Sequence, residues 1–284
     1  MKKSIIAFIS LIIFCIEPLM ASAEFSFKKY QVENGLSHNT TWCAIQDSYG
    51  FLWIGTSNGL NCYYGSGNKI YRNVLNDKYS LGNNFVSSLM EEGEDLWIGT
   101  SSGLYIYDRS DDHFLYFDKT TKYGVFISCE VKKIVKTKNG LIWIATLGQG
   151  IFIYDPAKDV LTQNSIRTFF AWDICQGTDS LVYVSSMQEG LLCFDEEGTF
   201  LQNYPVSSEL SIGNQRINCL HSIEHEIWCG VGTNSLGCYQ EGSQELKIYN
   251  TSAESFSSIL CLMDYNGKEM LVGTDNGVYL FDRE

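Results

Sequence analysis

The sequence of 284 residues is short of positive charge, which argues against general binding to nucleic acid. It holds 20 Lys and Arg against 33 Asp and Glu, a net charge of −13, so it gains nothing from releasing the counterions of a phosphate backbone. Proline is also scarce, with 3 residues, whereas glycine numbers 25 and aromatic residues make up 14%. That balance is typical of a β-rich chain with many tight turns and fits a long helical bundle poorly. An apolar content of 45% excludes a wholly disordered protein.

Long apolar runs are absent beyond the first residues, so we expect no membrane span in the rest of the chain. Lys2 and Lys3 precede an apolar run from Ser4 to Ile16, and the small residues Ala21-Ser22-Ala23 follow. This order predicts a secretory signal peptide over residues 1–23. A membrane anchor is disfavoured because a spanning helix needs about 20 apolar residues. The part from 24 to 284 has no linker-like stretch and is expected to be a single exported domain.

An internal repeat organises that domain. Leu52-Trp53-Ile54-Gly55-Thr56 recurs in five further copies, and the central positions are 53, 97, 143, 183, 228 and 271. A glycine turn and a second alternating stretch follow most copies, as in Gly103–Asp108, and a further alternating stretch such as Val86–Leu89 precedes them. Period-2 alternation bounded by Gly, Asn, Asp and Ser predicts strands joined by turns. Each unit of about 44 residues therefore reads as four antiparallel strands.

Six such units predict an all-β fold, a β-propeller of six four-stranded blades. One sheet cannot bury both of its faces, whereas radial stacking covers each face with the next blade. The sixth unit supplies only three strands before the sequence stops at Glu284. The alternating segment Phe25–Tyr30 has the pattern of the missing strand. We therefore expect the ring to be closed by pairing of Phe25–Tyr30 with the last blade.

The repeat resembles a known family, the two-component regulator propeller repeat. The resemblance rests on Gly35–Asn39, on Asp47–Leu60 and on Leu96–Leu104, and weaker copies extend it over all six units. In that family the repeats form the periplasmic sensor of bacterial hybrid two-component systems. The resemblance therefore implies a non-catalytic periplasmic sensor, with an oligosaccharide as its expected ligand.

The sequence departs from this family in several ways. The resemblance implies longer proteins, with two seven-bladed propellers, an immunoglobulin-like domain, a membrane helix, a histidine kinase and a DNA-binding domain. This sequence has six units and no kinase motif. It is therefore either a stand-alone propeller or the front part of a longer protein. Its expected partners are an oligosaccharide, a second propeller, an immunoglobulin-like domain or a second copy.

Several recurring residues are expected to be structural. Cys62, Cys193 and Cys238 stand where sister units have Ile or Leu, which predicts buried thiols, although an exported chain leaves disulfides open. The sequence contains no C-x-x-C pair, so a zinc site is not expected. The repeated Trp or Tyr predicts packing between blades, and the repeated glycine predicts close backbone approach. The segment Asp47–Gly50 is interpreted as a hairpin turn.

Candidate ligand-binding residues lie in the loops between strands, because loops on a rigid scaffold usually carry recognition. The loops that lead into the first strand of each unit and the loops between second and third strands open on one face of a propeller. Non-repeated polar and aromatic side chains in these loops suit stacking and hydrogen bonding to a neutral glycan. The candidates are His38, Phe85, Gln149, Arg167, Phe170, Trp172, Gln188, Arg216 and Asn234.

Three functions compete at this stage. A sensor that binds a ligand without catalysis is favoured, and no cofactor or metal is expected. An exported lyase or glycan hydrolase is the second hypothesis, with His38 as the one histidine to test, but no base and orienting partner are visible in the sequence. The third is a scaffold whose acidic surface docks a partner protein.

Overall fold

A computed structural model describes residues 28–65, 67–164, 166, 170–206, 216–250 and 258–283. The predicted signal peptide, residues 1–23, lies outside this part. Apart from a short 3-10 turn, η1 (Val32–Asn34), all named elements are strands. Within the described ranges, none of the helices is long and apolar enough to cross a membrane.

The strands form six separate antiparallel sheets, each a meander in sequence order. The predicted propeller of four-stranded blades is thereby confirmed. The first three sheets are β1 (Thr41–Gln46), β2 (Leu52–Thr56), β3 (Gly59–Tyr64) and β4 (Gly67–Tyr71); β5 (Val86–Glu92), β6 (Asp95–Thr100), β7 (Gly103–Asp108) and β8 (His113–Tyr116); β9 (Glu130–Lys136), β10 (Ile142–Leu147), β11 (Gly150–Asp155) and β12 (Val160–Gln163).

The last three sheets continue the pattern and end with a shorter one. They are β13 (Ala171–Gln176), β14 (Val182–Ser186), β15 (Leu191–Phe194) and β16 (Phe200–Tyr204); β17 (Ile217–Ile223), β18 (Glu226–Val231), β19 (Ser235–Gln240) and β20 (Leu246–Asn250); β21 (Ile259–Asp264), β22 (Glu269–Thr274) and β23 (Gly277–Asp282).

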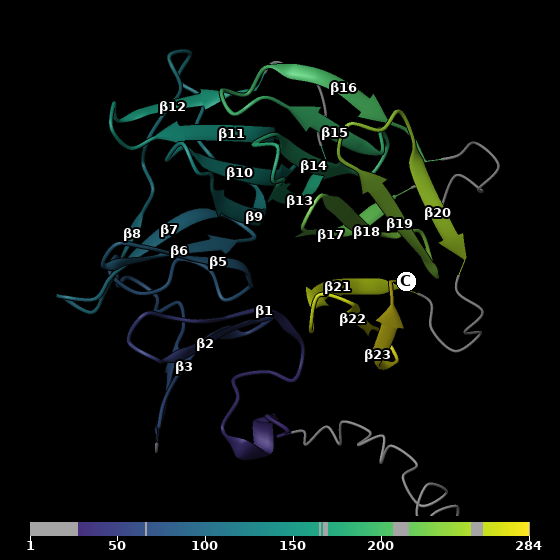
Figure 1. Ribbon diagram of the computed structural model, residues 1–284. Coiled ribbons are helices and arrows are strands. Elements are labelled where there is room, and N and C mark those ends of the chain that lie inside the picture. Colours follow the sequence, from purple (N-terminus) through teal and green to yellow (C-terminus); the bar gives the residue numbers. More distant parts are fainter. Residues whose placement is uncertain are drawn as a thin grey trace, which may run out of the picture.

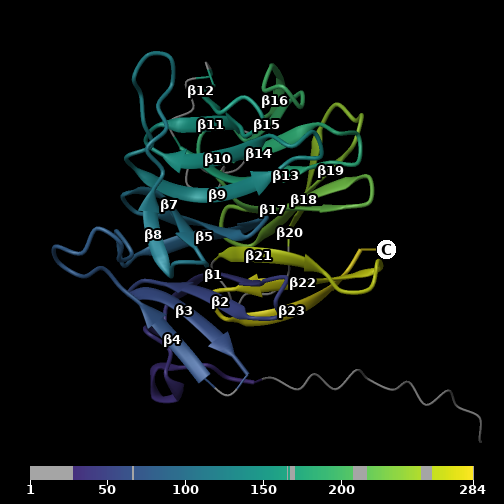
Figure 2. The ribbon, with the colours of Figure 1, turned by 90° about the vertical axis from the view of Figure 1, so that its left-hand side faces the viewer.

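The six sheets fan around a common axis in the order of the sequence (Figures 1 and 2). The first strand of each sheet lies innermost, and these strands contact one another from β1 to β5, β9, β13, β17 and β21 in turn. We name the two ends of this body by their connections. The loop face carries the segments that lead into the innermost strands and the turns between second and third strands. The turn face carries the remaining turns, such as Asp47–Gly50.

The core lies between the blades, as the repeat predicts. Trp53, Trp97, Trp143, Tyr183 and Trp228 are all buried. They belong to separate apolar clusters, each combining side chains from two neighbouring sheets. The recurring aromatic ring therefore holds one blade against the next in five units, and Leu271 takes its place in the sixth.

The recurring glycines lie where neighbouring blades approach most closely. A Cβ atom at Gly55 would come within 2.6 Å of a Val86 methyl carbon and 2.9 Å of the Val86 carbonyl oxygen. One at Gly99 would lie 2.8 Å from a methyl carbon of Val131. All three distances are shorter than real Cβ contacts, so these positions exclude a side chain, and the predicted structural role is confirmed.

The cysteines are free thiols throughout the described part of the chain. Cys62, Cys193 and Cys238 are buried and pair in register with the recurring aromatic residue, as Ile106 and Ile153 do in sister blades. Burial raises the pKa of Cys62 and of Cys193 to about 11, so both remain protonated at neutral pH. The prediction of buried thiols is confirmed at these three positions.

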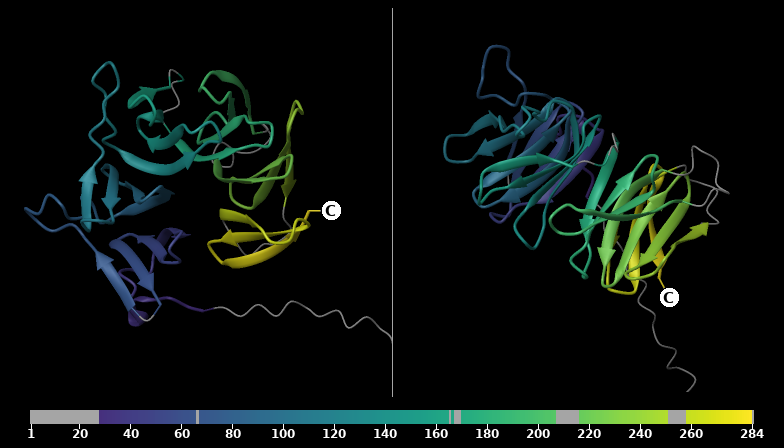
Figure 3. Two further views of the ribbon diagram at one scale, coloured as in Figure 1. Left: turned by 60° about the vertical axis from the view of Figure 1, so that its left-hand side comes forward. Right: turned by 90° about the horizontal axis from the view of Figure 1, so that it is seen from above.

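The sixth sheet departs from the other five. It has three strands among the described residues, and β21 and β1 share no contact comparable to those between the other innermost strands there. Val278 is 57% exposed, whereas its counterparts in the other five sheets are nearly inaccessible: Leu60, Leu104, Ile151, Leu191 and Leu236. On the side that would meet a following blade, the sixth sheet thus exposes the apolar side chains of Val278 and Leu280. Figure 3 shows the backbone of this sheet, in yellow, at the end of the series of blades.

Phe25–Tyr30 was expected to add the fourth strand here. Residues 25–27 lie outside the described part, and the remaining three form no strand. The Tyr30 ring instead packs edge-on against Tyr63 of β3, with ring centroids 5.0 Å apart. The pairing is therefore not formed by Lys28–Tyr30, because Tyr30 is held by the first sheet and a turn begins at Gln31. For residues 25–27 it stays a prediction.

Candidate functional site

A β-bulge at the loop-face end of each innermost strand shapes this face. In all six sheets the pairing between first and second strands shifts by one residue near the start of the first strand. A bulge re-aims the extra side chain away from the regular alternation. The extra residues vary in type, and Trp occurs in two blades. They are Trp42, Ser87, Lys132, Trp172, Asn218 and Leu260.

Three of these bulge residues meet. The Lys132 ammonium lies 4.2 Å from the centre of the Trp172 ring and 5.4 Å from that of Trp42. Glu130 accepts a hydrogen bond from the same ammonium at 3.0 Å. The Phe85 ring lies against Trp42 at 5.1 Å between centroids. Side chains from the first four blades therefore form one group, which we name the loop-face cluster: Trp42, Phe85, Glu130, Lys132 and Trp172.

The loop-face cluster combines exposed aromatic surface with a shielded charge. Trp42 is 46% exposed, whereas the Lys132 side chain is only 8% exposed. The Trp42 indole N–H also donates to Ser57 Oγ at 2.9 Å, which fixes the ring. An aromatic ring that is fixed in place and nearly half exposed suits stacking against a ligand ring.

A second ion pair lies one residue further along the same strands. Lys133 Nζ is 3.2 Å from Asp173, whose other carboxylate oxygen accepts the backbone N–H of Leu220 at 2.8 Å. The negative charge of Asp173 raises the pKa of Lys133, so this lysine stays protonated. Asp173 thus joins the third, fourth and fifth blades and stiffens the frame under the loop-face cluster.

The predicted site residues fall on the loop face wherever the structure describes them, and two of them enter the loop-face cluster. These two are Phe85 and Trp172. The Gln149 side chain instead bonds to the segment that leads into β9: it accepts the Ser128 backbone N–H and donates to the Phe126 carbonyl oxygen. His38 Nδ1 accepts the backbone N–H of Thr40 at 3.0 Å.

The other candidates lie apart from the cluster. Phe170 is 40% exposed beside Leu147, and Gln188 is exposed in the turn after β14. Arg216 and Asn234 are partly buried at β17 and before β19, and Arg167 lies outside the described residues. Trp42, Glu130 and Lys132 are not among the candidates that the sequence suggested. The sequence carries no repeated marker of these three positions, because the bulge that re-aims the side chains is visible only in the strand pairing.

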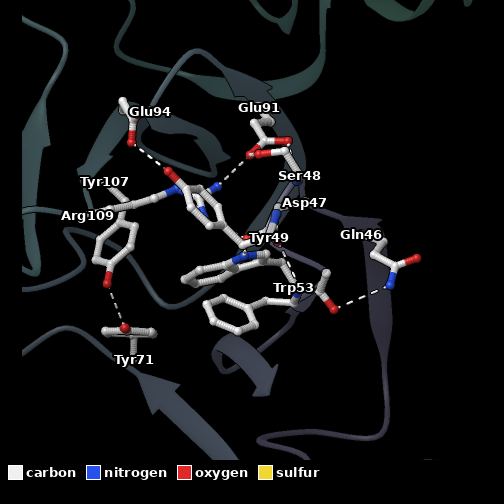
Figure 4. Close-up of polar contacts among 12 residues, drawn as sticks. Gln46, Asp47, Ser48, Tyr49, Trp53, Tyr71, Glu91, Glu94, Tyr107 and Arg109 are labelled. Carbon is white, nitrogen blue, oxygen red and sulfur yellow. Dashed lines mark hydrogen bonds and ion pairs between the residues drawn. The ribbon is translucent and has the colours of Figure 1, made fainter. Parts of the chain in front are cut away.

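The turn face carries a different feature, a groove between the first two blades. Two adjoining hollows of about 500 and 410 Å³ share Phe51 and Arg109. Exposed rings of Tyr49, Phe51 and Tyr64 border them. The Arg109 guanidinium lies over the Tyr49 ring at 4.9 Å. Figure 4 shows Tyr49 of the first blade and Arg109 of the second converging here.

Several polar groups of this groove bond to one another, although the buried Arg109 Nε has no hydrogen-bond partner. Arg109 donates to Asp47 at 2.6 Å and to Glu91 at 2.9 Å. Asp47 also accepts the N–H groups of Tyr49 and Phe51 and the Trp53 indole N–H at 2.7 Å. The interpretation of Asp47–Gly50 as a turn is confirmed, and Arg109 clamps that turn to the second blade (Figure 4). We name this arrangement the Arg109 clamp.

Comparisons with known proteins agree with this architecture. A sequence profile described as two component regulator propeller matches residues 35–58, which confirms the resemblance for the first repeat. "Histidine kinase P4" of Formosa agariphila is 40% identical over 60 residues, which are 21% of this chain and 4% of that protein. The chain thus spans a small fraction of this relative.

Solved structures with a similar fold include two extracellular domains from B. thetaiotaomicron. One belongs to a putative hybrid two component system (TM-score 0.75, 19% identity, 90% of this chain and 35% of that one). The other belongs to a putative one component system (TM-score 0.71, 18% identity, 91% and 35%). A catalytically inactive variant of virginiamycin B lyase from Staphylococcus aureus, solved with quinupristin, is also similar (TM-score 0.70, 12% identity, 90% and 84%). The chain spans about a third of the two extracellular domains.

Proposed function

Starting from the regulator-propeller repeat at residues 35–58, we propose that this chain is the sensor propeller of a bacterial two-component receptor. It is exported by the leader in residues 1–23 and acts in the periplasm. It recognises its ligand without chemical change. The likeness to extracellular domains of a putative hybrid two component system and of a putative one component system supports this reading, and the loop-face cluster supplies a surface for recognition.

The proposed ligand is an oligosaccharide held on the loop face. Sugar rings stack on flat aromatic faces, and Trp42 and Phe85 present such faces next to Trp172. The blades hold these rings rigidly, so little conformational entropy is lost on binding. The observation that carries the proposal is the convergence of aromatic side chains from the first, second and fourth blades at one end of the axis.

The uncovered apolar faces suit a protein neighbour. Val278 and Leu280 of β23 are 57% and 44% exposed, and surfaces of this kind often mark contacts with other proteins. A second propeller, an immunoglobulin-like domain or a second copy of the chain is the proposed partner.

Isothermal calorimetry tests the sensor proposal. The exported chain is titrated with a panel of neutral and charged oligosaccharides of two to six units. At least one member is expected to give saturable heat, and Trp42→Ala, which removes a stacking ring, is expected to weaken its binding at least tenfold, equivalent to about 1.4 kcal/mol. Tyr49→Ala is the matched control, an exposed aromatic residue on the turn face. The proposal is contradicted if no oligosaccharide gives saturable heat, or if both variants lose the same amount of binding affinity.

The alternative function is an exported lyase, and the similarity in fold to virginiamycin B lyase favours testing it. His38 is its test residue. Its Nδ1 is engaged by the Thr40 backbone, a contact that caps a loop rather than orienting a base. Turnover of any panel member that His38→Ala abolishes would favour the enzyme.

A further inference from the structure

Lys132 occupies a cage that the rest of the loop-face cluster builds. Its ammonium lies over the ring faces of Trp172 and Trp42, at 4.2 and 5.4 Å. The Glu130 carboxylate completes the surroundings at 3.0 Å. The two indoles come from the first and fourth blades and the lysine from the third, so the ring of bulged strands brings them together.

The chemistry of this cage favours positive charge. Aromatic ring faces carry the negative part of the ring quadrupole and attract cations, and Trp attracts them most strongly. Glu130 adds a formal negative charge, and the whole chain carries −13. An anionic ligand would meet repulsion from all three sources. The cage therefore fits an ammonium group.

The lysine itself is not required by the fold. The bulge recurs in all six sheets, yet its extra residue is Ser87 in the second blade, Asn218 in the fifth and Leu260 in the sixth. A lysine stem is long and flexible, so its head can leave the cage for solvent without moving the backbone. Lys132 thus has the properties of an occupant that can be exchanged.

We propose that the cage of Trp42, Trp172 and Glu130 is a subsite for a ligand ammonium group, and that Lys132 fills it until such a ligand displaces it. The inference rests on the proposed function and narrows its ligand to a glycan that carries a free amine. The sugar ring next to the amine stacks on Trp42 or Phe85, which gives the ligand contacts that the lysine stem lacks.

Matched trisaccharides test this subsite. One is the trimer of glucosamine, with protonated amines at pH 6, and the other is its N-acetylated, neutral counterpart. Calorimetry at fixed salt is expected to show the amine trimer binding at least tenfold more tightly to the wild-type chain. Lys132→Ala empties the cage and is expected to tighten binding of the amine trimer about tenfold further, equivalent to about 1.4 kcal/mol.

Two control variants separate the cage from general charge effects. Lys69→Ala removes another lysine over an aromatic ring, Tyr71 at 4.5 Å, but from the turn face. It is expected to leave both affinities unchanged. Glu130→Gln is expected to weaken binding of the amine trimer and to leave the neutral trimer unaffected, because only the cation needs the carboxylate.

The outcomes distinguish this inference from the sensor proposal. If the neutral trimer binds as tightly as the amine trimer, the ammonium subsite is overturned and the sensor proposal stands. If Lys132→Ala and Lys69→Ala change the affinity for the amine trimer equally, Lys132 is no occupant of the cage and the inference is likewise overturned. If neither trimer binds, and no member of the oligosaccharide panel gives saturable heat either, both proposals are overturned.

Discussion

Replacement of Arg109 by methionine gives a sharp test of how the first two blades are joined. The change keeps an unbranched apolar stem but removes the guanidinium. The Arg109 side chain is only 14% exposed. Asp47 has no exposed side-chain surface, so its charge would lose its only cationic partner in the Arg109 clamp. Breaking a buried ion pair costs about 3–5 kcal/mol. Asp47 keeps three N–H donors, so we expect the lower part of this range, about 3 kcal/mol.

Urea unfolding at pH 7 measures this loss, with tryptophan emission as the signal. The midpoint should fall while the slope m stays constant, which marks a change in stability alone. Asp47→Asn and the double variant complete a cycle, and a coupling of about 1.5–3 kcal/mol is expected between the two residues. A loss below about 0.5 kcal/mol, or additive single effects, would refute the clamp.

The pH dependence of the same variant follows from Asp47. Burial acts to raise the pKa of this carboxyl, but hydrogen bonds from Trp53 and Arg109 outweigh burial and hold the pKa below its ordinary value. A depressed pKa contributes stability above the unfolded pKa of about 3.9, and this contribution is lost as the pH falls through the lower folded value. The difference between wild type and Arg109→Met should therefore shrink on acidification from pH 7 towards pH 3.

Three further predictions concern contacts between blades. Gly55→Ala should lower the free energy of unfolding by about 1–3 kcal/mol in urea titrations, because its Cβ would meet Val86; unchanged stability would deny the close approach. Ser88→Ala should cost about 1–3 kcal/mol, since the buried N–H of Ile134 loses its acceptor at 3.1 Å, whereas Ser110→Ala at an exposed turn should be neutral. Removal of residues 24–29 should lower the Tm in calorimetry if this segment covers the β23 edge, and an unchanged Tm would exclude closure by it.

The repeated features of the fold could be predicted because they are packing positions used six times. Trp53 and Trp143 recur in sequence and are buried between blades, and Gly99 recurs and lies against Val131. A residue demanded by the same environment in each blade leaves a periodic trace, and this trace is visible without coordinates.

The features that occur once could not be predicted in this way. Arg109 reaches Asp47 across 62 positions of the sequence, and nothing in either segment marks the partner. Asn61 is fully buried where sister strands have Tyr105 or Phe152, because it bonds to Ser37 of the preceding loop.

Only part of the loop-face cluster could be predicted from the sequence, because its residues also occur once. Phe85 and Trp172 were chosen as unrepeated aromatic residues near loops, whereas Trp42 and Lys132 were not chosen. A bulge of one residue turns their side chains out of the alternating pattern, and alternation alone does not reveal where a bulge falls.

Tryptophan emission during oligosaccharide titration is the most direct test of recognition on the loop face. Four of the 6 tryptophans, Trp53, Trp97, Trp143 and Trp228, are buried, so Trp42 and Trp172 are the two that a ligand can reach. The expected result is a saturable change in emission with at least one panel member, absent in the double variant Trp42→Phe with Trp172→Phe. A saturable change that persists in the double variant, or none with any oligosaccharide in the wild-type chain, would contradict recognition by these two rings.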